Sequence, residues 1–74
     1  MDDKPIEIPA DPSALLTTKQ AAAFLNFTPR ALESWRIHGG GPHFVRVSAR
    51  AVRYRRRDLE DWIATKVIAS TSAA

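Results

Sequence analysis

The segment LTTKQAAAFLNFTPRALESW, residues 16–35, decides the fold of this 74-residue chain. Thr17 followed by Gln20 is a capping box, in which each side chain binds the backbone N–H of the other residue at the start of a helix. Asn26 tolerates the positive φ with which many helices end. These signals predict a first helix that begins after Thr17 and ends at Asn26.

A second helix is predicted directly after a short turn. Thr28 suits its N-cap and Pro29 its first position, because a proline there loses no helical hydrogen bond. Leu32 and Trp35 form its apolar face, and we expect it to run to about His38, where three glycines follow. Two short helices joined by a turn of this length have the spacing of a helix-turn-helix.

Residues 43–47 and 52–56 are predicted to form a hairpin around a turn at residues 48–51. If Val47 pairs with Val52, Arg46 lies opposite Arg53. Like charges directly opposite one another destabilise a strand pair. This register therefore favours an anion bound beside the two arginines.

The last helix is predicted to start near Arg57 or Asp58. Four of its apolar residues are spaced so that they lie on one face of a helix. They are Leu59, Trp62, Ile63 and Val67. This stripe should pack on the helix-turn-helix. Aromatic side chains on such stripes are expected in the core rather than as stacking platforms, and they are Trp35, Tyr54 and Trp62.

These elements define the fold class as mainly α with a small β-hairpin. It is a winged helix-turn-helix, made of a helix-turn-helix, a two-stranded wing and a C-terminal helix. Residues 15–69 are expected to form this domain, which has room for one small core. Residues 1–14 are predicted to be a disordered acidic, proline-rich arm, and residues 70–74 a disordered tail.

The formal net charge of +3 conceals three regions of unlike charge. Residues 19–57 hold nine basic residues against one acidic residue, a balance of +8, whereas residues 1–18 and 58–74 balance at −3 and −2. Eight of the nine cations are arginine, whose planar fork matches phosphate and guanine. A charge run is often only a solvated surface, but this segregation favours a polyanionic partner.

Several function classes lack the residues they need. The absence of cysteine excludes disulfides, a thiolate metal site and a cysteine nucleophile. His38 and His43 are too few for a metal site, and no glycine-rich phosphate loop opens a helix. We expect no cofactor, no metal, no small-molecule ligand and no enzymatic activity. No apolar run is long enough to span a membrane, so a cytoplasmic protein is expected.

The ordered set of residues resembles the small winged helix-turn-helix proteins of the MerR superfamily, of the excisionase and AlpA type. The matching residues, within about 16–63, are Leu16-Thr17-Thr18-Lys19-Gln20-Ala21-Ala22, Leu25, Pro29-Arg30-Ala31-Leu32, Trp35-Arg36, Gly41-Pro42, Phe44-Val45, Val52-Arg53-Tyr54-Arg55-Arg56 and Asp58-Leu59-Glu60-Asp61-Trp62. Three places depart from the family. Asn26-Phe27 replaces its usual turn residues, residues 48–50 lack its glycines, and Arg57 replaces its capping serine.

The resemblance implies binding to double-stranded DNA, with the second helix in the major groove and the hairpin on the backbone or in the minor groove. Candidate contacts on this recognition helix are Thr28, Arg30, Glu33, Ser34 and Arg36, and those on the wing are Arg46, Ser48, Arg50, Arg53 and Arg55. Arg30, in the first turn, is the foremost candidate for a base contact. The alternative for the helix residues is a solvated surface, and for Arg36 a pair with Glu33.

Three functions fit this implication to different degrees. The first is a recombination directionality factor of a bacterial or phage mobile element. Such a nucleoid-associated factor binds beside other copies of itself, bends DNA and favours excision by a partner recombinase. The second is a small AlpA-like transcription regulator. The third is a protein-interaction adaptor or antitoxin-like partner, which a steep fall of DNA affinity with salt would argue against.

Overall fold

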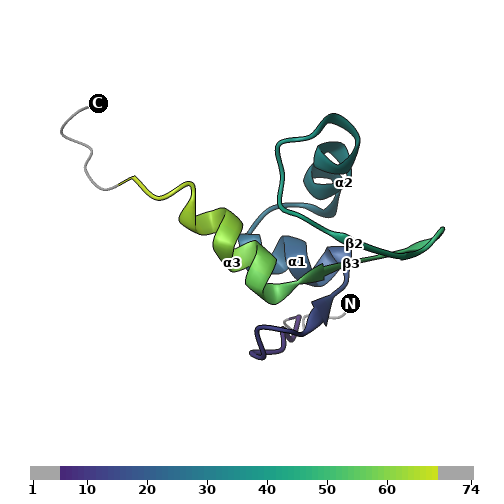
Figure 1. Ribbon diagram of the computed structural model, residues 1–74, viewed down its shortest axis with the longest axis horizontal. Coiled ribbons are helices and arrows are strands. Elements are labelled where there is room, and N and C mark those ends of the chain that lie inside the picture. Colours follow the sequence, from purple (N-terminus) through teal and green to yellow (C-terminus); the bar gives the residue numbers. More distant parts are fainter. Residues whose placement is uncertain (1–5, 69–74) are drawn as a thin grey trace, which may run out of the picture.

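The computed structural model describes residues 6–68, so the tail expected at residues 70–74 lies outside the described part. Within residues 6–68 the chain forms three helices and three short strands. In chain order (Figure 1) they are β1 (Leu15–Leu16), α1 (Thr18–Leu25), α2 (Pro29–His38), β2 (Val45–Ser48), β3 (Ala51–Arg55) and α3 (Arg56–Ala64). α1 packs against α2, α3, β1 and β3, whereas the β2–β3 hairpin projects away from the helices. No helix of this part is long and apolar enough to cross a membrane.

The predicted boundaries of the helix-turn-helix are confirmed. The Gln20 backbone N–H donates to the Thr17 hydroxyl at 3.1 Å, and the Thr17 N–H donates to the Gln20 side-chain oxygen at 2.9 Å. Asn26 ends α1 with a φ of 62°. The Thr28 hydroxyl accepts a hydrogen bond from the Ala31 N–H at 3.2 Å, and a proline opens α2 as expected. Every one of these contacts spans only three residues, which is why the sequence alone indicates them.

The core takes one large side chain from each of four elements. These side chains are at most 1% exposed and are Leu16 of β1, Leu32 of α2, Tyr54 of β3 and Leu59 of α3. α1 contributes only Ala21 and Ala22, whose small size lets the neighbouring elements approach its backbone closely. Tyr54 is therefore a core residue as predicted.

The two tryptophans are half-buried rather than fully enclosed. Trp35 of α2 and Trp62 of α3 lie against each other with ring centroids 5.1 Å apart, and Phe27 packs edge-on against Trp35 at 5.2 Å. The groove beside these rings has a volume of about 520 Å³ and is lined also by Phe24 and Ile63. The aromatic cluster joins the helix-turn-helix to α3.

The sheet has one strand more than the predicted hairpin. Its order is β1-β3-β2, and both strand pairs are antiparallel. β1 pairs Leu15 with Arg55 and Leu16 with Tyr54. A strand of two residues carries no periodic pattern, so the sequence gives no signal for it. Its effect is to cover the edge of β3 at the base of the wing.

The predicted hairpin register is wrong by one residue. Arg46 lies opposite Val52 and Val45 opposite Arg53, because a β-bulge interrupts the pairing before the turn. A bulge sets two residues against one, and Val47 is the extra residue, 58% exposed. Directly opposite residues share a face of the sheet, so Arg46 and Arg53 lie on different faces. The argument for an anion held between them fails.

The prediction of a disordered arm over residues 1–14 is contradicted over residues 6–14, the part that the structure describes. Ile8 packs against the core. The Gln20 side-chain amide donates to the Glu7 carbonyl at 3.0 Å, and the Arg57 backbone N–H donates to the Pro12 carbonyl at 2.9 Å. A proline-rich segment has few N–H donors but keeps its carbonyl acceptors. Donors from α1 and α3 satisfy these acceptors and hold the segment in place.

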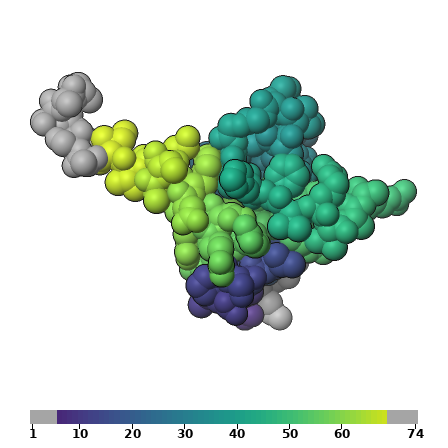
Figure 2. All heavy atoms as spheres, viewed as in Figure 1, coloured from purple at the N-terminus to yellow at the C-terminus, as the bar shows by residue number. Residues whose placement is uncertain are grey.

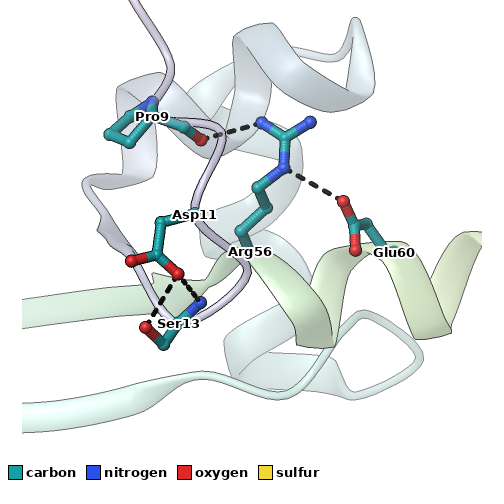
Figure 3. A network of polar contacts seen from close by, with 5 residues as sticks. All are labelled: Pro9, Asp11, Ser13, Arg56 and Glu60. Carbon is teal, nitrogen blue, oxygen red and sulfur yellow. Dashed lines mark hydrogen bonds and ion pairs between the residues drawn. The ribbon is translucent and has the colours of Figure 1, made fainter.

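Arg56 is the centre of this attachment (Figure 3). Its guanidinium donates to the Pro9 carbonyl at 2.9 Å and to the Glu60 carboxylate at 3.0 Å. It also lies 4.7 Å from the centroid of the Phe24 ring. Close by, the carboxylate of Asp11 accepts from the backbone and the hydroxyl of Ser13, both at 2.9 Å. Arg56, counted above as part of the basic region, is thus used inside the domain.

α3 begins at Arg56, earlier than predicted, directly after β3 and without a side-chain cap. It ends at Ala64, where the Thr65 hydroxyl donates to the Trp62 carbonyl at 2.6 Å. The predicted stripe is therefore wrong at Val67, which follows the helix and is 71% exposed. Leu59 carries the full burial that the stripe predicts.

Candidate nucleic-acid interface

α2 exposes one polar face along its length. The residues of this face are exposed side chains at positions 30, 33, 34 and 37, whereas Leu32 is fully buried on the opposite side. Arg30 lies in the first turn, where recognition helices of helix-turn-helix proteins reach base edges. The structure thus brings Arg30, Glu33 and Ser34 together on one accessible surface.

Two of the predicted contact residues on α2 also bind within the helix. The Thr28 hydroxyl caps it, as described above, and so already accepts one hydrogen bond. The Ser34 hydroxyl lies 3.4 Å from Nδ1 of His38, which is itself 3.1 Å from the Ser34 carbonyl. Arg30 and Glu33 have no such partner among residues 6–68, so their polar atoms are available to a ligand.

Arg36 lies on a different side of α2, facing the sheet. Its guanidinium donates to the Tyr54 hydroxyl at 2.7 Å and to the Thr18 hydroxyl at 3.3 Å. It also lies 5.9 Å from the Phe44 ring centroid and 6.0 Å from that of Tyr54. The alternative partner Glu33 is not used. Arg36 therefore ties α2 to α1 and to the base of the wing, and its side chain is only half-exposed.

The wing distributes its arginines over both faces and the tip. Arg46 lies on the same face as Val52 and stacks over Phe44 at 5.9 Å, whereas Arg53 lies on the other face and donates to the Val52 carbonyl at 2.9 Å. Arg50 is exposed in the turn, where its backbone N–H lies 3.4 Å from the Ser48 hydroxyl. Cations are therefore available to a nucleic-acid groove or backbone on both faces of the wing and at its tip.

Arg55 belongs to the base of the wing and is paired. Its guanidinium forms a forked ion pair with Asp58 at 2.8 and 3.2 Å. The hydrogen bonds to Asp58, and then its charge, raise the pKa of Arg55 above its ordinary value. Asp58 thus supplies a counter-charge to this cation, although the side chain stays 47% exposed.

The basic region thus divides into bound and available arginines. Arg36, Arg55 and Arg56 bind side chains within the domain, two of them in the ion pairs found among residues 6–68. The cations of α2 and the wing whose guanidinium groups form neither an ion pair nor a hydrogen bond with another side chain there are Arg30, Arg46, Arg50 and Arg53. In Figure 2, α2 at the top and the hairpin at the right project from the body of the molecule, while the N-terminal segment lies at the bottom.

Sequence reasoning missed two features of this surface. The cation of Arg46 rests on Phe44, which precedes it by two residues and therefore lies on the same side of the strand in either register. Ile37 is 78% exposed on the polar face of α2 and was not a candidate. The sequence could have indicated it, because Ile37 follows Arg30 by seven residues, and residues i and i+7 lie on one side of a helix.

A helix-turn-helix followed by a projecting two-stranded hairpin and a further helix defines a winged helix-turn-helix protein. Residues 15–67 match the family described as a helix-turn-helix domain, and the chain belongs to this family. It is a small helix-turn-helix DNA-binding protein. No curated protein matches the chain.

Proposed function

We propose that this protein is an architectural DNA-binding factor of the excisionase type, a recombination directionality factor. α2 enters the major groove of double-stranded DNA, and the wing contacts the adjacent backbone or minor groove. The observation that carries the proposal is the division of the arginines. Those that join elements of the domain have internal partners, whereas Arg30 on α2 and Arg46, Arg50 and Arg53 on the wing are available to phosphates and bases.

The DNA contacts fall into two groups in this proposal. Arg30 and Glu33, with Thr28 and Ser34 beside them, read or approach base edges from α2. Arg46, Arg50, Arg53 and Ser48 contact the backbone or the minor groove, with Arg55 in a lesser role because Asp58 compensates its charge. Arg36 moves from the contact set to a positioning role, because its guanidinium is bound to Tyr54 and Thr18.

The salt dependence of duplex binding tests the DNA contacts. With about four phosphate contacts, the slope of log K against log salt is about −3.6, and affinity falls about 150-fold between 50 and 200 mM salt. Arg50→Ala should lower the magnitude of the slope by about 0.9. The matched control is Arg57→Ala, an exposed arginine beside the N-terminal segment, which should leave the slope unchanged. A flat salt response would overturn the proposal and favour an adaptor or antitoxin-like role.

The architectural role needs DNA bending and binding of several copies. Copies bound side by side on adjacent sites would bend the duplex and favour excision by a partner site-specific recombinase. Duplexes selected from a random library and then permuted in site position test this by gel mobility. A mobility that depends on site position, with stepwise extension of the footprint, supports the architectural factor. Specific binding without a bend would favour an AlpA-like transcription regulator instead.

This function places the protein at the nucleoid, in the cytoplasm of a bacterium or a phage-infected cell. Imaging of a fluorescent fusion that follows the DNA stain tests this placement. The chemistry of strand exchange belongs to the recombinase in this proposal, and the protein acts by shaping its substrate.

A further inference from the structure

Ile37 is more exposed than any other large hydrophobic side chain among residues 6–68, at 78%. Exposure of one apolar residue is common and carries no conclusion by itself. The position of Ile37 is informative, because it lies on α2, the helix proposed above to enter the major groove.

Helical geometry places Ile37 in line with Arg30. Seven residues at about 100° each return to within about 20° of the starting direction. Leu32, fully buried, lies on the opposite side of the helix from this line. A surface that presents Arg30 to the groove therefore presents Ile37 as well.

The spacing also fits a duplex. Seven residues rise about 10.5 Å along the helix axis, which corresponds to about three base pairs at 3.4 Å each. α2 has ten residues and is about 15 Å long, so a helix that follows the major groove covers this distance. Both ends of its exposed face are thus within reach of the groove floor or wall.

The chemistry of the groove offers one apolar feature, the C5-methyl group of thymine. Isoleucine has no polar group in its side chain and can distinguish bases only by such a contact. We propose that Ile37 is a specificity-determining residue that packs against a thymine methyl about three base pairs from the pair read by Arg30. This rests on the proposed DNA-binding role of α2.

A protein partner is the competing explanation for an exposed isoleucine. The apolar groove of this domain is lined by Phe24, Phe27, Trp35, Trp62 and Ile63, together with Leu25, and Ile37 is not part of it. Trp35 lies two residues away and so points about 200° around the helix. Ile37 is therefore separated from the one extended apolar surface found at α2 among residues 6–68, and is flanked by Glu33 and Ser34 instead.

The test removes single methyl groups from DNA. A high-affinity duplex is selected from a random library, and each thymidine is replaced in turn by deoxyuridine, which keeps base pairing and lacks the methyl. The wild-type protein should lose about fourfold in affinity at one thymine, the factor expected for one buried methyl-sized group. Ile37→Ala should bind thymidine and deoxyuridine equally at that position. Ile68→Ala is the matched control, since Ile68 is 76% exposed but lies outside α2, and it should keep the wild-type ratio.

The outcomes separate this inference from the function on which it rests. If the selected duplex binds specifically and Ile37→Ala keeps the wild-type ratio at every thymine, the thymine contact is overturned. If that variant instead loses only the cooperative binding of further copies, Ile37 contacts protein and the proposal is likewise overturned. Failure to select any duplex, with a flat salt response, overturns the DNA-binding function itself. Circular dichroism of both alanine variants, each at an exposed position, checks that their fold is unchanged.

Discussion

The helix-turn-helix and the wing of this domain are held together in different ways. In the first, capping side chains fix the helix boundaries locally, and the fully buried Leu32 anchors α2 in the core. In the wing, residues 46–50, which include the turn, are all exposed, so only its base contacts the core, through Phe44, Val52 and Tyr54. α2 is thus held in place by the core, whereas the position of the wing depends on the contacts at its base. Arg36, bound to Tyr54, is the side chain that connects the two.

The largest effect should come from the core of the helix-turn-helix. Leu32→Ala removes a fully buried side chain and should lower the free energy of unfolding by about 2–5 kcal/mol, through lost burial and the remaining cavity. Val47→Ala in the wing removes an apolar side chain that is 58% exposed, and should change stability by less than about 0.5 kcal/mol. Urea denaturation followed by circular dichroism measures both. Equal losses of unfolding free energy in the two variants would show that the wing packs in the core as the helix-turn-helix does, contrary to the difference described above.

The connection between the two regions should come next. Tyr54→Phe removes the hydroxyl that accepts from Arg36 at 2.7 Å and leaves a half-buried guanidinium short of an acceptor, at a cost of about 1.5–3 kcal/mol. A double-mutant cycle with Arg36→Ala should give a coupling of about 0.5–3 kcal/mol in urea unfolding. The cycle should also couple the two positions in DNA affinity, although the proposed DNA contacts include neither side chain. Additive effects in both measurements would remove the positioning role of Arg36.

The same contrast explains which parts of the fold could be predicted from the sequence. Thr17, Asn26 and Thr28 act on neighbours within a few residues, so their identity and spacing suffice. The hairpin register depends on a bulge at Val47, and a one-residue insertion of this kind reverses the facing of every residue beyond it. No pattern in alternating valines and arginines distinguishes the bulged pairing from the regular one.

Prediction of the N-terminal segment and of the candidate site from the sequence was limited, because both depend on contacts between residues that are distant in the chain. The carbonyl of Pro9 is held by Arg56, 47 residues away, so composition alone suggests disorder where the structure has a fixed path. For the site, the sequence indicates which arginines exist and which helix presents them. It does not indicate that Arg36 and Arg55 have internal partners. The partner of Arg36 is Tyr54, on another element. The pair between Arg55 and Asp58 depends on the residue at which α3 begins.

On DNA, the two regions should differ in specificity. Arg30→Ala should cost about 1–3 kcal/mol at the selected site and relax sequence preference, since a base contact is lost. Arg50→Ala should weaken selected and random duplexes to a similar extent, because a wing contact with phosphate carries no sequence information. Fluorescence anisotropy with both duplexes gives the ratio of affinities. An unchanged ratio in Arg30→Ala would mean that α2 is not the reading element.

The smallest effect concerns the N-terminal segment, which is held by donors from α1 and α3 and contributes no predicted DNA contact. The Ser13 backbone N–H, and then its hydroxyl, lower the pKa of Asp11 below its ordinary value of 3.8, because they donate to the ionised carboxylate. A group whose pKa is depressed in the folded state stabilises that state above its unfolded pKa. The contribution is lost as the pH falls through the folded pKa.

Asp11→Asn keeps an acceptor oxygen but cannot titrate, so it isolates this contribution. The difference in unfolding free energy between the wild type and Asp11→Asn should be constant above about pH 5 and should narrow below about pH 4. Urea midpoints at pH 6 and pH 3 measure the change, which should be small because Asp11 is exposed. If the segment were detached in solution, Ser13 could still cap Asp11 locally, and folding would not change the pKa. The difference in unfolding free energy between the two proteins would then be independent of pH. A difference that narrows in acid therefore indicates that residues 6–14 are ordered as part of the domain.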